Sequence, residues 1–186
     1  MDTTNKVFLG IGLILLLLTI IGGASLWINR LTWDNEVGSY IDLADKSSNL
    51  QVKYEYVLKY RTALYEHRLT EGYSNPIWQT PTEDLNENFK AVESLVSRMD
   101  DIRALDVNSA EYQWALSQVT EEEIPHIAGT CSGEGHCGNY DNIFYNGWNY
   151  QKGGLNWFWQ SGWGFVILII MTIFSIIMLI ASAVYY

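Results

Sequence analysis

Residues 153–186 read GGLNWFWQSGWGFVILIIMTIFSIIMLIASAVYY and carry no charged side chain. The stretch begins with aromatic residues and is then apolar to its last position. Its first rings belong to Trp157, Phe158, Trp159 and Trp163. At about 1.5 Å per residue, a helix over residues 163–185 is long enough to cross a bilayer core of roughly 30 Å. We therefore expect a transmembrane helix over residues 163–186, with no cytoplasmic domain after it.

A second charge-free run covers residues 7–28, after a short tail of residues 1–6. Apart from Asp2 and Lys6, every charged residue lies between the two apolar runs, and the chain as a whole has a formal net charge of −10. The sequence therefore predicts an acidic domain that is held to a membrane at both of its ends. Such a domain repels phosphate backbones, which excludes nucleic acid as a partner.

The first apolar run has two interpretations. Residues 7–21 are followed by the small residues Gly22-Gly23-Ala24-Ser25, as in a cleaved signal peptide. However, the run continues through Trp27 and Ile28, which makes it longer than the apolar part of a usual signal peptide. The length favours an uncleaved transmembrane helix, and cleavage stays open as the alternative.

The predicted orientation depends on few charges. Lys6 and the α-amino group precede the first run together with Asp2, and Arg30 follows the run. The positive-inside rule gives most weight to such short flanks, and here it leans slightly toward a cytoplasmic N-terminus. We expect both termini on the cytoplasmic side and the central domain outside the cytoplasm, periplasmic or extracellular. The two cysteines agree with this, because disulfides persist in oxidising compartments.

Helical periodicity dominates residues 29–128, for which we expect an acidic helical bundle. Apolar residues recur at helical spacing over residues 33–69, with a break or a shift at Ser47-Ser48-Asn49. The apolar stripe is expected to consist of Trp33, Val37, Ile41 and Ala44 before the break and of Leu50, Tyr54, Val57, Leu64 and Tyr65 after it. Lys53 and the other basic residues fall on faces that are expected to be solvated. The next helix is expected to start with a capping box and to end near Leu105. Its apolar face is expected to consist of Leu85, Phe89, Val92, Leu95, Val96, Met99 and Ile102. Its start is formed by Thr80, Pro81 and Glu83. A third helix is expected from Asn108 or Ser109, and the short connections favour antiparallel neighbours.

Beyond this bundle the composition changes. Pro125 is expected to end regular helix, and residues 129–162 are rich in glycine, asparagine and aromatic residues. We interpret residues 129–162 as an irregular, membrane-proximal loop that carries a cysteine pair. The predicted fold is thus all-α, with two transmembrane helices bracketing an extracytoplasmic helical bundle.

The residues with the most reactive side chains lie within a short segment. They are His126, Cys131, His136 and Cys137. Cysteine and histidine are zinc ligands, but the segment lacks the Cys-x-x-Cys spacing of known zinc sites and of haem attachment. A disulfide between Cys131 and Cys137 is the favoured interpretation, and a metal site or a pair of free thiols are the alternatives.

Two further groups are candidates for contacts with a partner. The acidic triplet Glu121, Glu122 and Glu123 offers a contact for a cation or a basic protein surface, although charge runs are most often simply solvated. The tryptophans Trp148, Trp157 and Trp159 are expected to be exposed, and exposed aromatic rings are common at protein interfaces. Small residues in both apolar runs permit close helix packing but do not require it.

The motifs of common enzymes are missing from the sequence. No nucleophile has a recognisable base, and no glycine-rich loop suits a nucleotide. We expect no enzyme and no cofactor. The favoured function is a non-catalytic, membrane-anchored accessory subunit that binds a partner membrane protein, or self-associates, within the lipid bilayer. The alternatives are an extracytoplasmic ligand-sensing module that signals through a partner and, less favoured, a metal- or redox-dependent enzyme at residues 126–137.

Two parts of the chain together resemble the LemA family. These parts are Asn29-Arg30-Leu31, Asn35-Glu36-Val37, Tyr54 and Tyr60 after the first apolar run, and Tyr140-Asp141-Asn142 with Leu155-Asn156-Trp157-Phe158-Trp159 near the end. The resemblance implies an N-terminally anchored, extracytoplasmic helical bundle and transfers no functional residues. The second apolar run and the cysteine pair depart from the family pattern, and so does the lack of a basic run in the first long helix.

Overall fold

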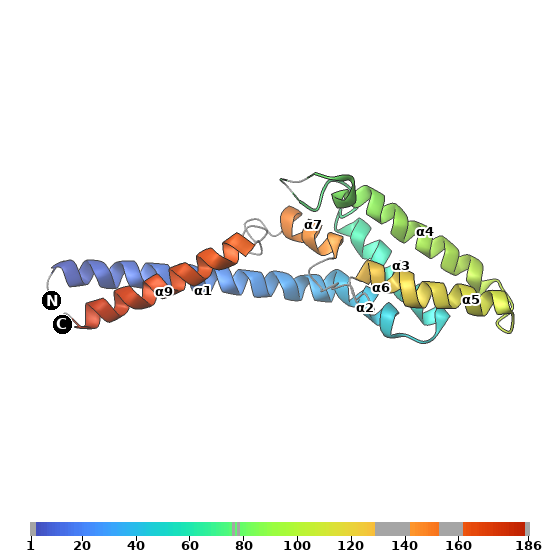
Figure 1. The fold of residues 1–186 in the computed structure, drawn as a ribbon, viewed down its shortest axis with the longest axis horizontal. Helices are drawn as coiled ribbons and strands as arrows, with labels where there is room; N and C mark the ends of the chain where they lie inside the picture. Colours follow the sequence, from blue (N-terminus) through green and yellow to red (C-terminus); the bar gives the residue numbers. More distant parts are fainter. Residues whose placement is uncertain (1–2, 76, 78, 129–141, 153–161, 185–186) are drawn as a thin grey trace. The chain divides into compact units, whose positions relative to one another are not determined.

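The computed structural model describes residues 3–75, 77, 79–128, 142–152 and 162–184 (Figure 1). Within these residues, regular structure is helical except for an isolated bridge between Tyr73 and Asp84. The chain divides into two compact units. The apolar unit comprises Met1–Leu31 with Gly153–Tyr186, and the acidic unit comprises Thr32–Lys152. The all-α class expected from the sequence is thereby confirmed for the part of the chain that is described.

The apolar unit contains two helices that are long and apolar enough to span a membrane. Helix α1 covers Thr3–Trp33, so that its last two residues belong to the acidic unit, and helix α9 covers Gly162–Val184. Most of their large apolar side chains are exposed. Exposed apolar side chains are expected of helices that face lipid, whereas the core helix of a soluble protein buries one face.

Helices α1 and α9 contact each other through small residues. The Ser175 hydroxyl donates a buried hydrogen bond of 2.8 Å to the carbonyl oxygen of Gly12. A Cβ atom added at Gly12 would lie 3.1 Å from the Leu179 side chain, so glycine permits this approach. Close approach at small residues, with a hydroxyl bonded across the interface, is typical of paired membrane helices.

The acidic unit begins with a helical hairpin. A π-helical turn, Asp34–Gly38, leads into α2 (Ser39–Lys46), and α3 follows as Leu50–Glu66. The break predicted at residues 47–49 is confirmed. Its cause is Asn49, whose side-chain oxygen accepts hydrogen bonds from the backbone N–H groups of Gln51 and Val52 and so caps α3.

Helix α3 ends in a Schellman motif. The N–H of Leu69 donates to the carbonyl of Leu64 at 2.8 Å, and the N–H of Arg68 donates to that of Tyr65 at 3.0 Å. Arg68 has a φ of 60°, in the left-handed region that favours glycine. The motif turns the chain so that Leu69 is buried and His67 is held at the end of the helix.

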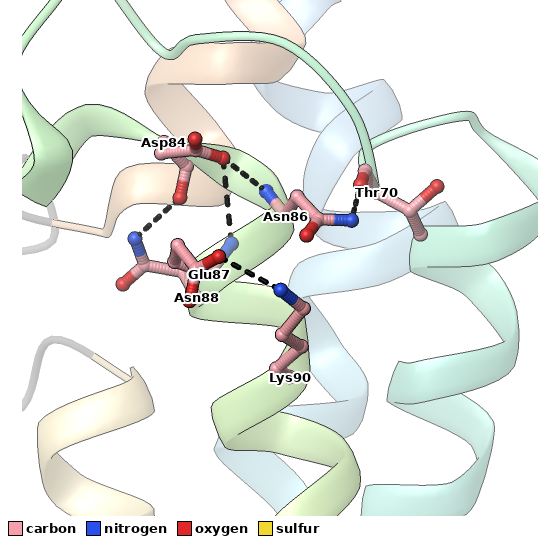
Figure 2. A network of polar contacts seen from close by, with 6 residues as sticks. All are labelled: Thr70, Asp84, Asn86, Glu87, Asn88 and Lys90. Carbon is pink, nitrogen blue, oxygen red and sulfur yellow. Dashed lines mark hydrogen bonds and ion pairs between the residues drawn. The ribbon is translucent and has the colours of Figure 1, made fainter.

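Helix α4 covers Leu85–Arg103, and its predicted start is wrong. Figure 2 shows Asp84 at the start of the helix, bonded to Asn86 and Glu87 of its first turn. Pro81–Glu83 form a separate 3-10 turn, and the Thr80 side chain makes no capping hydrogen bond. The cap is Asp84, whose carboxylate accepts from the N–H groups of Asn86 and Glu87 at 2.8 and 3.4 Å. Glu83 is unavailable for a capping box because its carboxylate bonds the Ser74 hydroxyl instead. Aspartate ranks above threonine as a cap, and here it directly precedes Leu85, the first apolar residue of the helix.

Helix α5 covers Ala110–Gln118 and is capped by Ser109, one of the two residues predicted for its start. A π-helical turn, Val119–Glu123, joins it to α6 (Ile124–Ala128). The expectation that Pro125 ends regular helix is therefore wrong. Proline lacks an N–H and crowds the preceding turn, and the wider π-turn before α6 accommodates it.

Part of the predicted loop at residues 129–162 is also helical. Ile143–Gln151 form α7, capped by the Asn142 side chain, which accepts from the N–H groups of Phe144 and Tyr145. The helix buries the rings of Phe144, Tyr145 and Trp148 in the core of the acidic unit, against α4 among others. Glycine and asparagine led the sequence interpretation toward a loop, but this apolar face offsets their low helix propensity.

A single core joins the helices of the acidic unit. The predicted stripe Trp33, Val37, Ile41 and Ala44 is buried, as are most of the predicted apolar positions of α4. Two positions of α3 differ from expectation. Tyr65, expected on the apolar face, is 70% exposed, whereas Lys53, expected on a solvated face, is 1% exposed. The Lys53 ammonium donates to the carbonyls of Ala44 and Asp45 at 2.9 and 3.1 Å, so it satisfies the end of α2.

Candidate binding groove between helices α4 and α5

A groove of about 420 Å³ lies between the second half of α4, helix α5 and the π-turn Val119–Glu123. Apolar side chains that include Ile102, Ala115 and Val119 line it. The indole of Trp114 also lines the groove and is 66% exposed. A single exposed ring is common at a protein surface, but here the ring continues the apolar lining of a hollow, and apolar hollows are the usual form of binding sites.

Two local features shape the groove: a short turn keeps α4 and α5 close in the chain, and small or half-buried side chains on α5 leave space between them. The turn between α4 and α5 is short, because Ser109 caps α5 six residues after Arg103 ends α4. Helix α5 contributes no fully buried residue, and its packing face consists of the half-buried Tyr112, Ala115 and Leu116. Since Ala115 is small, it leaves space between the two helices that a larger side chain would fill.

Charged side chains also line this groove. The Arg98 guanidinium forms an ion pair with the Glu123 carboxylate, with 2.6 Å between Nη2 and Oε2. Arg98 is 53% exposed and Glu123 is 23% exposed. Asp101 and Glu111 line the same groove, so three carboxylates face one guanidinium. The groove therefore combines an apolar interior with a negative electrostatic potential.

A second polar cluster, the His67 cluster, consists of Glu36, His67, Trp148 and Lys152. Lys152 Nζ lies 2.6 Å from His67 Nδ1, and Glu36 Oε2 lies 3.3 Å from His67 Nε2. The imidazole packs edge-on against Trp148 at 5.0 Å, and the Lys152 ammonium lies 4.7 Å from the same indole. This arrangement suits a neutral imidazole that accepts from Lys152 at Nδ1 and donates to Glu36 from Nε2.

The electrostatics of the His67 cluster favour that neutral form. Burial lowers the pKa of His67, and the positive charge of Lys152 lowers it further, against the opposing effect of Glu36 and Glu66. Burial also lowers the pKa of Lys152, while Glu36 raises it. The cluster thus joins the end of α3 to the end of α7 by contacts that depend on protonation.

The predicted interaction residues have different environments. Glu121 is exposed and Glu123 is ion-paired in the π-turn, whereas the side chain of Glu122 lies outside the described residues. The exposure expected of Trp148 is wrong, since its ring is 3% exposed in the core. Trp157 and Trp159 lie outside the described residues.

The predicted disulfide or metal site belongs to the cysteine–histidine segment, residues 126–137. Cys131, His136 and Cys137, together with the His126 side chain, lie outside the described residues. The disulfide and its metal and thiol alternatives therefore stay predictions. Elsewhere, in the part of the chain that the structure describes, no group of three or more histidine, cysteine or acidic side chains is placed to hold a metal ion.

Two residues of the groove were missed in the sequence. Trp114 does not fit the spacing of Tyr112, Ala115, Leu116 and Val119, and an apolar residue off the stripe of an amphipathic helix is expected to be exposed. That signal was present and would have identified it. The pairing of Arg98 with Glu123 joins two helices, and the spacing of charges along the chain contains no such signal.

Comparison with known proteins adds no relative to this description. No family model, no curated protein and no solved structure matches the chain. The LemA resemblance therefore stays a prediction.

Proposed function

We propose that this protein is a non-catalytic, membrane-anchored accessory subunit whose acidic unit binds a partner membrane protein through the α4–α5 groove. The observation that carries the proposal is the exposed indole of Trp114 beside an apolar groove. Tryptophan and arginine are the residues most enriched at the energetic centres of protein interfaces, and the groove offers both. Its volume accommodates several side chains of a partner.

The anchoring part of the proposal is supported by α1 and α9. Each is long and apolar enough to span a membrane, and they pair through Gly12 and Ser175. The charge at Lys6 favours a cytoplasmic N-terminus, which would place the acidic unit outside the cytoplasm and both termini inside. In that arrangement the partner lies in the same membrane or presents an extracytoplasmic segment, and nucleic acid is excluded by charge.

Site-specific photo-crosslinking in the native membrane tests this function. A photoreactive amino acid replaces Trp114 in one variant and Tyr65 in the control, because Tyr65 is equally exposed but lies on α3. We expect one stoichiometric membrane protein crosslinked from position 114 and not from position 65. Equal crosslinking from both positions, or from neither, would contradict the proposed function.

A second function, the sensing of a small solute, is favoured by the groove volume alone. About 420 Å³ lies within the range of ordinary ligand sites, roughly 300 to 1,000 Å³. Here the groove would bind an organic cation, and the signal would pass to a partner. Thermal unfolding of the full chain with a panel of organic cations separates the two functions. A solute that stabilises the wild type but not the Trp114→Ala variant would favour sensing.

A further inference from the structure

We infer that the segment bound in the α4–α5 groove is basic, and that its arginine or lysine binds Glu123 in place of Arg98. This inference rests on the proposed function and adds to it the chemistry of the partner. In the free protein, Arg98 is then an internal substitute for the cation of the partner. The inference is carried by the geometry of one ion pair, by the charges around it and by the apolar surface beside it.

The ion pair is built so that it can be exchanged. Glu123 is held in the π-turn and is mostly shielded, whereas the guanidinium that binds it is 53% exposed at the end of a flexible side chain. An ion pair whose cation is largely exposed contributes little to stability, because solvent screens the charge and the long arginine side chain loses entropy. Replacing Arg98 therefore costs little, while a cation buried under a bound partner gains a better-shielded contact.

The charges around Glu123 favour a bound segment with a positive charge. Asp101 and Glu111 line the groove together with Glu123, and Glu121 is exposed on the same π-turn. Once Arg98 is displaced, all the charged groups that line the groove are carboxylates. An acidic segment would meet repulsion, and a neutral segment would offer Glu123 no cation in exchange for Arg98.

The apolar surface beside Glu123 fits the remainder of a basic side chain. Arginine and lysine place their methylene groups along apolar surfaces and keep their charge at a polar end. In this groove the methylenes would lie on Val119 and Ala115, and the exposed face of Trp114 offers the cation a favourable quadrupole. A segment with a basic residue between aliphatic residues satisfies all of these features.

The test uses two synthetic peptides that differ in one charge. Both are short, acetylated and amidated, with leucines around a central residue that is arginine in one and its neutral isostere citrulline in the other. The full-length protein is placed in phosphatidylcholine nanodiscs, whose lipid has no net charge, and binding is followed by the indole N–H resonance of Trp114. A Trp114→Phe variant assigns that resonance.

We expect the arginine peptide to bind about tenfold more tightly than the citrulline peptide, the usual effect of one charge-assisted hydrogen bond. Glu123→Gln should remove this preference, and Glu123→Asp should keep part of it. Arg98→Gln should raise the affinity for the arginine peptide several-fold, because the internal competitor is gone. Arg61→Gln is the matched control, since it breaks an ion pair of 2.7 Å between α3 and α4 that is not part of the groove.

The other outcomes overturn the inference in distinguishable ways. Equal binding of both peptides at Trp114 would leave the groove as a docking site but remove its recognition of a cation. A loss of affinity in Arg98→Gln would make Arg98 part of the receptor. If neither peptide shifts the Trp114 resonance of the folded protein, the inference fails, and crosslinking from position 114 then decides on the proposed function alone.

Discussion

Helices α5 and α7 have the same length, but α7 is packed in the core and α5 lies at the surface. Ala110–Gln118 and Ile143–Gln151 both span nine residues, and each begins with a polar side chain that caps its first turn. Yet α7 buries Phe144, Tyr145 and Trp148, whereas α5 has no fully buried residue and exposes Trp114. An aromatic helix can thus complete a core or present a surface, and its stripe decides between the two more directly than its composition.

The largest effect is expected when the tryptophan of each helix is replaced by alanine. Trp148→Ala should lower the free energy of unfolding by about 3–5 kcal/mol, because it empties a filled core position between Trp33 and His67. Trp114→Ala should change it by less than about 1 kcal/mol, because the ring is mostly solvated. Urea unfolding of the full chain in micelles, followed by circular dichroism, measures both. Equal losses would contradict the assignment of α7 to the core and α5 to the surface.

The capping residues sharpen the same contrast at a smaller scale. Asn142 caps α7 and also donates to the carbonyl of Ile127 at 3.2 Å, and it is buried. Asn142→Ala should therefore cost about 2 kcal/mol, at the upper end for a cap, while Ser109→Ala on α5 should cost about 1 kcal/mol or less. Unfolding curves of the two variants give the difference. An equal cost would mean that the second bond of Asn142 contributes nothing.

The helices were largely predictable, because their signals are local. The stripe of α4, the break at Asn49 and the cap at Ser109 each depend on residues within a few positions of one another. The same locality explains the misplaced start of α4, where Thr80 and Asp84 are both capping residue types within a few positions and Glu83 bonds Ser74 rather than closing a capping box. Local rules give the class and most of the helices, with errors at their ends.

The groove and the interior were less predictable, because they depend on contacts between distant residues. Lys53 reads as a surface residue, and only the fold brings it to the end of α2. The sequence of α7 suggests a loop, and only the packing of its apolar face against α4 and α3 makes it a core helix. The pairing of Arg98 with Glu123 requires the position of the π-turn. The one part of the groove within reach of the sequence was Trp114, which lies off the stripe of its helix.

Acidification should act on the α7 side of the unit through His67. Because the folded-state pKa of His67 lies below its ordinary value of about 6.5, the unfolded chain binds the proton more tightly. The stability that His67 contributes is therefore fully present above that value and is lost as pH falls toward the lower folded-state pKa. Protonation places an Nδ1–H group against the Lys152 ammonium. This repulsion weakens the His67–Lys152 contact between the ends of α3 and α7.

Nuclear magnetic resonance of the imidazole and hydrogen exchange along α7 measure this effect. Lys152→Met should raise the pKa of His67, since it removes a neighbouring positive charge, and Glu36→Gln should lower it. Exchange in α7 should quicken on acidification in the wild type and much less in His67→Gln. Exchange in α5 serves as the internal control, because its residues make no contact with the His67 cluster among those described. A folded-state pKa of His67 above the ordinary value would contradict this account.

The smallest effect concerns the turn that presents His67 to α7. Arg68 occupies the left-handed position of the Schellman motif with a φ of 60°, where a side chain is strained and glycine is not. Arg68→Gly should therefore raise the free energy of unfolding by roughly 0.5–1 kcal/mol, reduced by the greater flexibility of glycine in the unfolded chain. Gly72, with a φ of 88°, is the matched opposite, and Gly72→Ala should destabilise by a similar amount or more. If both substitutions changed the free energy of unfolding in the same direction, backbone strain would not limit the stability of this turn. The contact between α3 and α7 would then have to be attributed to the His67 cluster alone.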